Sequence, residues 1–164
     1  MDDLVFRYDV YYKKYSNVPF TGRITGKEQG LMKNGKKDGY WFKEVNKIKS
    51  YQGVYKNGKK EGLWITRFPT KGSKDNLKSQ GHYKNGKKEG LWIVNGVFGL
   101  RSEGKYYNGE RDGQWETYHF NGQLESSGRY SNGMKQNYWF FYNKNGYLIR
   151  EYSGNYYDDK KISN

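Results

Sequence analysis

A pattern of twelve residues, Gly-x-x-x-Asn-Gly-x-x-x-(Gly/Asn)-x-Trp, occurs five times in this 164-residue chain and constrains its fold more than any other feature. The first glycines of successive copies are 23, 28, 23 and 24 residues apart, and all five tryptophans of the chain occupy the last position. The copies span residues 30–41, 53–64, 81–92, 104–115 and 128–139. Such a period is typical of tandem repeats in which each repeat is one supersecondary unit.

The Asn-Gly pair inside each copy predicts a tight turn. A type I′ turn needs positive φ at both central residues, so Asn-Gly is the strongest short-range signal of a β-hairpin. This set consists of Asn34-Gly35, Asn57-Gly58, Asn85-Gly86, Asn108-Gly109 and Asn132-Gly133. Asn121-Gly122 and Asn145-Gly146 fall in the other half of their repeats and are expected to reverse the chain the other way. These turns predict one antiparallel meander of about ten to twelve short strands.

The composition favours strands and argues against an ordinary core. Alanine is absent, while Gly, Tyr and Trp number 22, 18 and 5. Leu, Ile, Val and Phe together make only 29 of the 164 residues, which is too few to fill a two-layer core. We therefore predict an all-β fold, an elongated single-layer antiparallel β-meander of tandem hairpin repeats. Its cohesion is expected from a structural aromatic ladder. The ladder consists of Trp41, Trp64, Trp92, Trp115 and Trp139.

The repeat resembles that of the MORN-repeat variant family, which includes the bacterial YwqK-like antitoxin proteins. The matching residues are Gly-x-Tyr-x-Asn-Gly-Lys-x-x-Gly-x-Trp and a following hairpin, here Phe120-Asn121-Gly122-Gln123-Leu124. Pro19-Phe20-Thr21-Gly22 resembles the segment that begins such arrays, and the similarity covers roughly residues 17–157. The resemblance implies a single-layer sheet used for protein interaction or scaffolding. It also implies toxin immunity, as in some bacterial members, or contact with membrane phospholipid, as in eukaryotic ones.

The repeats predict three segments. Residues 1–22 are expected to form an N-terminal capping hairpin, and residues 154–164 a degenerate C-terminal repeat or tail. Between them, residues 23–153 form a MORN-like array of about five repeats with an insertion near 69–76. Asn137 stands where the other copies have glycine, and we interpret it as a capping change.

The compartment is not fixed by the sequence. Bacterial members of the family often carry an export signal ahead of a segment similar to residues 4–14. The resemblance therefore implies that Met1 is an expression start and that the native protein is exported or lipid-anchored. A cytoplasmic protein is the alternative.

No constellation of residues predicts catalysis, a cofactor or a metal site. The chain has no cysteine, and its two histidines, His82 and His119, have no partner at a fixed spacing. The acidic residues Asp38, Glu61, Glu89 and Asp112 share one position of the repeat. An active site needs one carboxylate in a special environment rather than four in equivalent ones. We therefore expect these carboxylates to bond turns or adjacent lysines, and we expect no enzyme.

Basic residues recur at one turn position and form a candidate binding site. The net charge of the chain is +13. This basic turn ladder consists of Lys36, Lys37, Lys59, Lys60, Lys87, Lys88, Arg111 and Lys135. Strands lie about 4.8 Å apart, so a two-strand repeat would place basic pairs about 10 Å apart along one edge. Such an edge attracts acidic partners, although exposed lysines also keep a sheet soluble and discourage edge pairing.

A second candidate is an aromatic group near the C-terminus that departs from strict repetition. Its members are Tyr107, Tyr118, Phe140, Phe141, Tyr142 and Tyr147. The leading hypothesis is a non-enzymatic binding module for an acidic protein, as a scaffold or as an immunity protein against a toxin. The alternative is an electrostatic binder of anionic membrane lipid or cell-envelope polymer, and nucleic acid is the least favoured partner. A monomer or an edge-paired dimer is expected.

Overall fold

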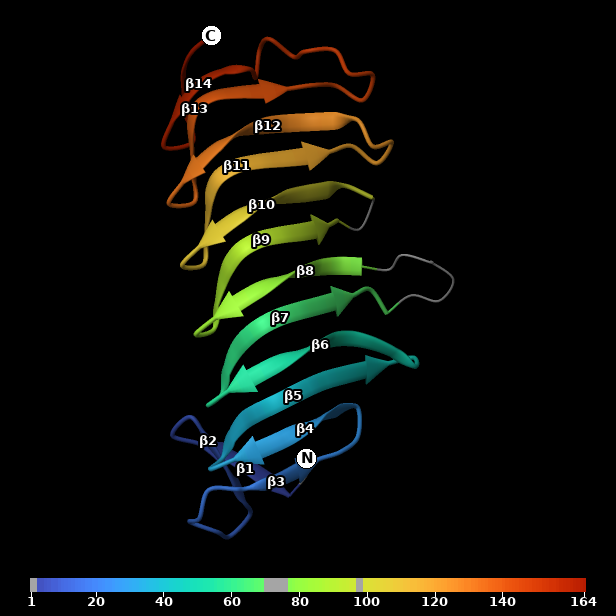
Figure 1. The fold of residues 1–164 in the computed structure, drawn as a ribbon, viewed down its shortest axis with the longest axis vertical. Coiled ribbons are helices and arrows are strands. Elements are labelled where there is room, and N and C mark those ends of the chain that lie inside the picture. Colours follow the sequence, from blue (N-terminus) through green and yellow to red (C-terminus); the bar gives the residue numbers. More distant parts are fainter. Residues whose placement is uncertain (1–2, 70–76, 97–98) are drawn as a thin grey trace. The chain divides into compact units, whose positions relative to one another are not determined.

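The computed structural model of the chain describes residues 3–69, 77–96 and 99–164, and these residues form 15 strands and no helix (Figure 1). The strands are β1 (Leu4–Arg7), β2 (Val10–Lys13), β3 (Gly22–Ile24), β4 (Glu28–Lys33), β5 (Lys36–Val45), β6 (Ile48–Lys56), β7 (Lys59–Arg67), β8 (Leu77–Lys84), β9 (Lys87–Asn95), β10 (Arg101–Tyr107), β11 (Glu110–Tyr118), β12 (Leu124–Ser131), β13 (Met134–Phe141), β14 (Gly154–Tyr157) and β15 (Lys160–Ser163).

Thirteen of these strands, β3 to β15, belong to one sheet whose strand order follows the chain order, while β1 and β2 pair separately. This confirms the predicted all-β antiparallel meander. The predicted number of ten to twelve strands is too low for the described residues. The segment ahead of the first copy still pairs as β3, and the degenerate last copy still forms β14 and β15.

The chain divides into two compact units. Unit 1 comprises Met1–Leu77 and Tyr83–Gly86, and unit 2 comprises Lys78–His82 and Lys87–Asn164. The segment predicted as an N-terminal cap, 1–22, holds β1 and β2, and the predicted C-terminal segment, 154–164, holds β14 and β15. The insertion predicted near 69–76 falls almost entirely outside the described residues.

The Asn-Gly turns of the five copies have the predicted geometry. Their asparagines have φ between 50° and 52°, and the following glycines have φ between 71° and 97°, as type I′ turns require. At the other end of the repeats, Asn46 and Lys47 also both have a positive φ, 53° and 63°, but a later turn differs. At Asn121-Gly122 only the glycine has a positive φ, 84°, and the Asn121 side chain accepts a hydrogen bond from the Gln123 N–H at 3.2 Å.

The first glycine of each copy makes room for the tryptophan that ends the copy. A Cβ atom added at Gly104 would lie 2.3 Å from Cδ2 of Trp115, and the other four copies show the same arrangement. The indole N–H of Trp115 donates to the carbonyl oxygen of Lys105 at 2.8 Å. Strand pairing shifts by a bulge next to Gly104, and Gly113 in the partner strand has a φ of 76°. The two glycines therefore leave the space that the indole ring of Trp115 occupies.

Tyrosines fill the spaces between successive tryptophans on what we call the inner face. In unit 1, Tyr55 meets Trp41 and Trp64 edge-to-face, with centroid distances of 6.2 and 5.0 Å. In unit 2, Tyr106 lies in the same way between Trp92 and Trp115. All five tryptophans are no more than 3% exposed. The sheet thus buries its tryptophans within a single layer, where edge-to-face pairs add about 0.5–1.5 kcal/mol each beyond burial.

Half a repeat precedes the first copy. The N–H of Asn34 donates to Thr21 Oγ1 at 2.9 Å, and the N–H of Gly35 donates to the Phe20 carbonyl at 2.7 Å. In the second, third and fourth copies the corresponding N–H groups of Asn57, Asn85 and Asn108 donate to the preceding turn. Residues 20 and 21 therefore take the place of a preceding turn.

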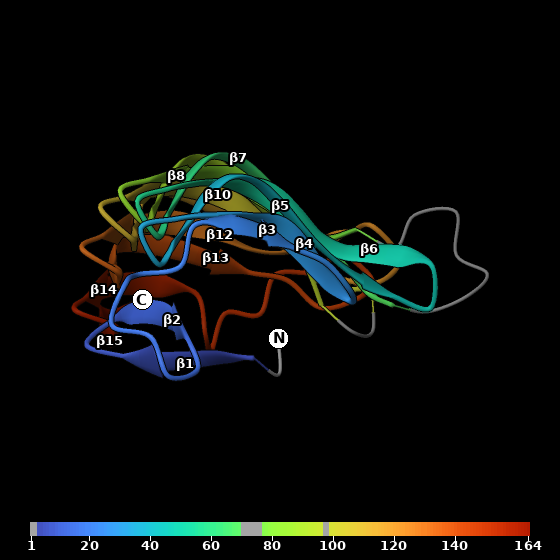
Figure 2. The ribbon, with the colours of Figure 1, turned by 90° about the horizontal axis from the view of Figure 1, so that it is seen from below.

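The hairpin of β1 and β2 covers the start of the inner face. Figure 2 shows both strands standing off the sheet beneath β3 and β4. Leu4 and Tyr11 from the hairpin pack against Met32 and Trp41. An isolated two-stranded hairpin is marginally stable in water, so β1 and β2 depend on this contact and on the hydrogen bond from the Tyr11 N–H to the Gly35 carbonyl.

Asn137 proves not to be a capping change. Its φ is 61°, close to the values of 64–76° at the glycines that occupy the same position in the other copies. Asparagine is the non-glycine residue that most readily adopts this left-handed conformation. The fifth copy therefore keeps the backbone of the others.

Candidate functional site

The basic turn ladder divides into two rows, because successive residues of a strand point to opposite faces. The second basic residue of each turn lies on the inner face over aromatic rings. Lys37 Nζ is 4.4 Å from the ring centroid of Trp41 and 5.2 Å from that of Tyr55. This inner row consists of Lys37 and Lys60 in unit 1, and of Lys88, Arg111 and Lys135 in unit 2. Each such cation stabilises the face by about 0.5–2 kcal/mol.

The inner row is also partly desolvated. Burial lowers the pKa of the Lys135 ammonium, although Asp159 opposes that shift. Burial acts on Arg111 in the same sense, but hydrogen bonds with Tyr106 and Tyr130 outweigh it and raise the pKa of the guanidinium. These cations are therefore part of the packed face rather than a free binding edge.

The first basic residue of each turn forms the outer row, which consists of Lys36 and Lys59 in unit 1 and Lys87 in unit 2. The stem of Lys36 lies over the glycine of the next turn, with its carbons 3.6–3.8 Å from where a Cβ of Gly58 would be. All three side chains are exposed, and within the described residues none has a hydrogen bond, ion pair or ring contact. Glu110 and Met134 occupy the same position in later repeats, so the row ends at Lys87.

Within each unit, hydrogen bonds link successive turns of the repeat. In unit 1, the N–H of Gly58 donates to the Lys37 carbonyl at 2.8 Å, and the N–H of Asn57 donates to Asp38 Oδ2 at 3.1 Å. Glu61 and Glu89 accept the equivalent bonds at 2.9 and 3.0 Å. The predicted turn bonding is thus confirmed for three of the four repeated carboxylates. We call the resulting stack of turns the turn column.

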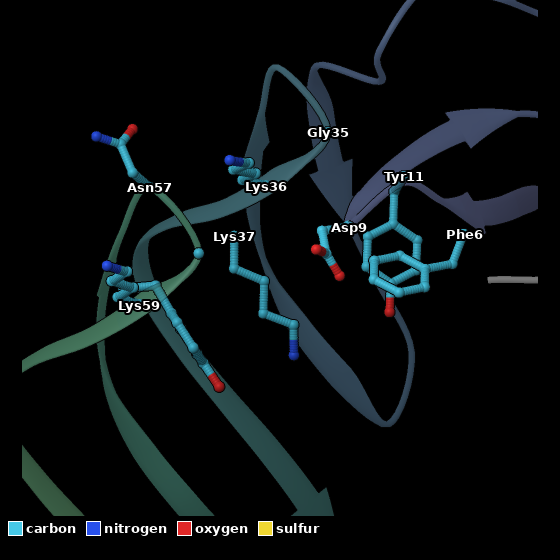
Figure 3. Close-up of a pocket in the computed structure, with 10 residues that line it drawn as sticks. Phe6, Asp9, Tyr11, Gly35, Lys36, Lys37, Asn57 and Lys59 are labelled. Atoms are coloured by element: carbon cyan, nitrogen blue, oxygen red, sulfur yellow. The ribbon is translucent and has the colours of Figure 1, made fainter. Parts of the chain in front are cut away.

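A cavity of about 410 Å³ lies in unit 1 between the turn column and the N-terminal hairpin (Figure 3). Phe6, Asp9 and Tyr11 line it from the hairpin side. The column side is formed by Gly35, Lys36, Lys37, Tyr55, Asn57, Gly58 and Lys59. Sequence reasoning placed the lysines at an edge but did not find this cavity, because nothing in the repeat indicates where the non-repeating hairpin docks.

The predicted C-terminal aromatic group is not one cluster. Phe141 lies on the inner face with Trp139, at a centroid distance of 6.0 Å. Phe140 and Tyr142 stack on each other at 6.5 Å, and Tyr138 approaches Phe140 at 4.7 Å. Neighbours in the sequence are therefore separated by the alternation of the strand.

The other members of that group lie apart. Tyr107 and Tyr147 are exposed beside turns, and the Tyr118 hydroxyl donates to Glu103 and Glu116. The hydrogen bond to Glu116, with burial, raises the pKa of Tyr118 to about 12. A cavity of about 490 Å³ in unit 2 is lined by none of the six predicted aromatics. Its lining consists of Tyr138, Leu148, Arg150, Glu151, Ser153 and Asn164.

Unit 1 also exposes an apolar row on the face opposite the tryptophans, which sequence reasoning missed. Leu31, Tyr40, Val54 and Leu63 come from the four neighbouring strands β4 to β7 and are 41–53% exposed. At the position of Leu31 and Val54, the copies in unit 2 have polar residues, namely His82, Lys105 and Arg129. At the position of Tyr40 and Leu63 they have Leu91, Gln114 and Tyr138. The sequence signal was the apolar pair Leu31 and Val54, at a position that is polar in the later copies.

Glu28 forms a non-repeating ion pair with Lys37 on the inner face. Its carboxylate accepts hydrogen bonds from Lys37 Nζ and the Tyr51 hydroxyl. Burial alone would raise the pKa of Glu28, but these hydrogen bonds and the charges of Lys37 and Lys43 outweigh it, so the pKa is lowered. Burial and the charge of Glu28 in turn raise the pKa of Tyr55 to about 12.

This carboxylate predicts a pH-dependent stability. A lowered folded-state pKa contributes stability above the unfolded pKa and loses it as pH falls through the folded pKa. We expect Glu28→Gln to cost about 1–3 kcal/mol at pH 7, as for hydrogen bonds to a charged group, and almost nothing near pH 3. Urea unfolding at both pH values measures the difference. Glu44→Gln is the control, since Glu44 has no side-chain partner in the described residues. An equal cost of Glu28→Gln at both pH values would contradict the assignment.

Comparisons with known proteins leave the family open. No protein-family model matches the chain, and no curated protein is significantly similar to it. The described residues contain no cluster of His, Asp or Glu that could hold a metal ion. They also form no helix that is long and apolar enough to cross a membrane.

Proposed function

We propose that this chain is a non-enzymatic protein-binding module whose turn column receives an acidic segment of a partner protein. One observation carries the proposal. The outer-row lysines have stems fixed against the next turn and ammonium groups without partners in the described residues. A fixed row of unpaired charges raises the association rate of an oppositely charged protein and suppresses wrong partners.

One further feature supports a protein partner over a bare anion. The apolar row of unit 1, beginning at Leu31 and Tyr40, offers exposed hydrophobic surface that a polymer of phosphates would leave uncovered. The inner row, by contrast, is held over aromatic rings and adds little to binding. The partner is either an assembly component or, as the resemblance to antitoxin proteins suggests, a toxin.

Affinity purification from the source cells tests this function. The full chain is compared with a bait that carries Lys36→Glu and Lys59→Glu, at low and at physiological ionic strength. We expect an acidic protein that the native bait retains and the charge-reversed bait loses by about tenfold or more, since each 1.4 kcal/mol is tenfold. The retained protein must then bind the purified chain directly.

Other outcomes count against the proposal. Recovery of the same proteins by both baits would contradict it. Co-sedimentation with anionic but not neutral vesicles, lost on charge reversal and without any protein partner, would replace it with the lipid-binding alternative. Binding to single- or double-stranded nucleic acid in a gel shift would replace it in the same way. Thermal melting of both baits shows that neither result comes from unfolding.

A further inference from the structure

The N-terminal hairpin gives the cavity of unit 1 an aromatic wall. The rings of Phe6 and Tyr11 lie 4.7 Å apart, and Figure 3 shows them on the side of the cavity opposite the turn column. Tyr11 also packs against the inner face, but Phe6 is 59% exposed. An aromatic ring left open beside a cavity is a site where another planar apolar group can pack.

The facing wall is basic. Lys36 and Lys59 line it together with Lys37, against a single aspartate, Asp9. Lys37 is already paired with Glu28, so its charge is neutralised within the fold. The outer-row lysines Lys36 and Lys59 have no such partner in the described residues. Figure 3 shows the Asp9 carboxylate on the hairpin side, facing Lys37.

Hydrogen bonds hold the two walls at a fixed separation. The N–H of Tyr11 donates to the Gly35 carbonyl at 2.9 Å, and the N–H of Gly35 donates to Phe20 at 2.7 Å. A Cβ at Gly35 would lie 2.1 Å from Val10 Cγ1, so the hairpin rests directly on the first turn. The cavity is therefore largely preformed, which is the usual condition of a specific ligand site.

We propose that this cavity receives an aromatic side chain from the acidic segment of a partner protein, with flanking carboxylates on Lys36 and Lys59. The inference rests on the proposed function and names the chemistry of its partner. A volume of about 410 Å³ is ample for one aromatic side chain, since ligand sites begin at about 300 Å³. The ring packs on Phe6, while Asp9 accepts an N–H from the peptide backbone. A polyphosphate has no such donor and is repelled by Asp9.

Two labelled peptides test the proposal by fluorescence anisotropy on the full chain. One carries a phenylalanine between three glutamates on each side, and the other has alanine in its place. We expect the phenylalanine peptide to bind about tenfold more tightly or better, which is a difference of 1.4 kcal/mol. Phe6→Leu, which keeps an apolar contact with Tyr11, should reduce the preference to less than about twofold.

A matched pair of variants isolates the basic wall. Both lysines belong to the outer row, but Lys59→Gln should weaken the binding of the phenylalanine peptide more than Lys87→Gln does. Lys87 has the same position in its repeat and the same packing over a turn glycine, but it does not line the cavity. Proton NMR of the native chain adds a measurement without substitution, because a bound ring shifts the ring resonances of Phe6 and Tyr11.

The outcomes separate this inference from the function on which it rests. Equal affinity for the two peptides, with strong dependence on salt and sensitivity to Lys59→Gln, overturns the inference and leaves the proposed function standing. Absence of binding to either peptide counts against both. A preference for phenylalanine that survives Phe6→Leu and leaves the rings of Phe6 and Tyr11 unshifted places the aromatic site elsewhere and overturns the inference.

Discussion

Replacing Gly104 with alanine is expected to destabilise unit 2 by about 3 kcal/mol or more. The new Cβ would lie 2.3 Å from the Trp115 ring, so the ring must move out of its buried position. That ring is 2% exposed and its indole N–H bonds to Lys105. Overpacking alone costs about 1–3 kcal/mol, and losing the packing of a buried tryptophan costs up to about 3–5 kcal/mol. Urea unfolding followed by tryptophan fluorescence measures the loss.

Gly113→Asn is the matched control. Gly113 has a φ of 76° with no atom within 4 Å of an added Cβ, and Asn137 adopts the same conformation in the fifth copy. We expect a cost below about 1 kcal/mol, since asparagine tolerates the left-handed region. A double-mutant cycle with Trp115→Leu adds a second check. Because Gly104→Ala acts through the ring, the two costs should be strongly non-additive. A cost of Gly104→Ala below that of Gly113→Asn would contradict this account.

The backbone was predictable because each local signal agrees with the repeat. Asn57-Gly58 dictates a type I′ turn by itself, and the register of the hairpin follows from it. The docking of β1 and β2 was not predictable, since it depends on contacts such as that of Tyr11 with Trp41. Those contacts join residues far apart in sequence and occur once.

The candidate site was only half predictable. The pattern located the lysines at turns, but Lys36 and Lys37 appear equivalent in a sequence. Their separation follows from the twofold alternation of strands together with the position of the rings. The prediction of one C-terminal aromatic group was wrong for the same reason, because Phe140 and Phe141 are adjacent in sequence and lie on opposite faces. Both the two lysine rows and the two sets of aromatics follow from the alternation of side chains along a strand, when the turn residues are included.

The division into two rows predicts opposite effects for two variants of equal charge. Lys36, Lys59 and Lys87 are changed to glutamine in the outer variant, and Lys37, Lys60 and Lys88 in the inner variant. Each lowers the net charge by three, from +13 to +10. The inner variant loses three cations that lie over rings, at about 0.5–2 kcal/mol each. We expect it to lose about 3 kcal/mol, and a Tm lower by roughly 6–12 °C for a chain of this size.

The outer variant should behave in the opposite way. Its lysines are exposed and have no hydrogen bond, ion pair or ring contact within the described residues, so its Tm should stay within about 2 °C of the native value, as for ordinary surface substitutions. The outer variant should instead lose affinity for an acidic ligand. If each lysine contributes about 0.5 kcal/mol to an acidic ligand, which is typical of an exposed pair, the loss is roughly tenfold.

The most direct test of the central claim is the affinity of these two variants for a labelled peptide of ten glutamates, at a temperature where both are folded. We expect the outer variant to bind about tenfold more weakly than the native chain and the inner variant to stay within about threefold, because of these six lysines only the outer-row ones have ammonium groups that are free within the described residues. Equal weakening in both variants would contradict the proposed role of the turn column, because net charge alone would then attract the ligand.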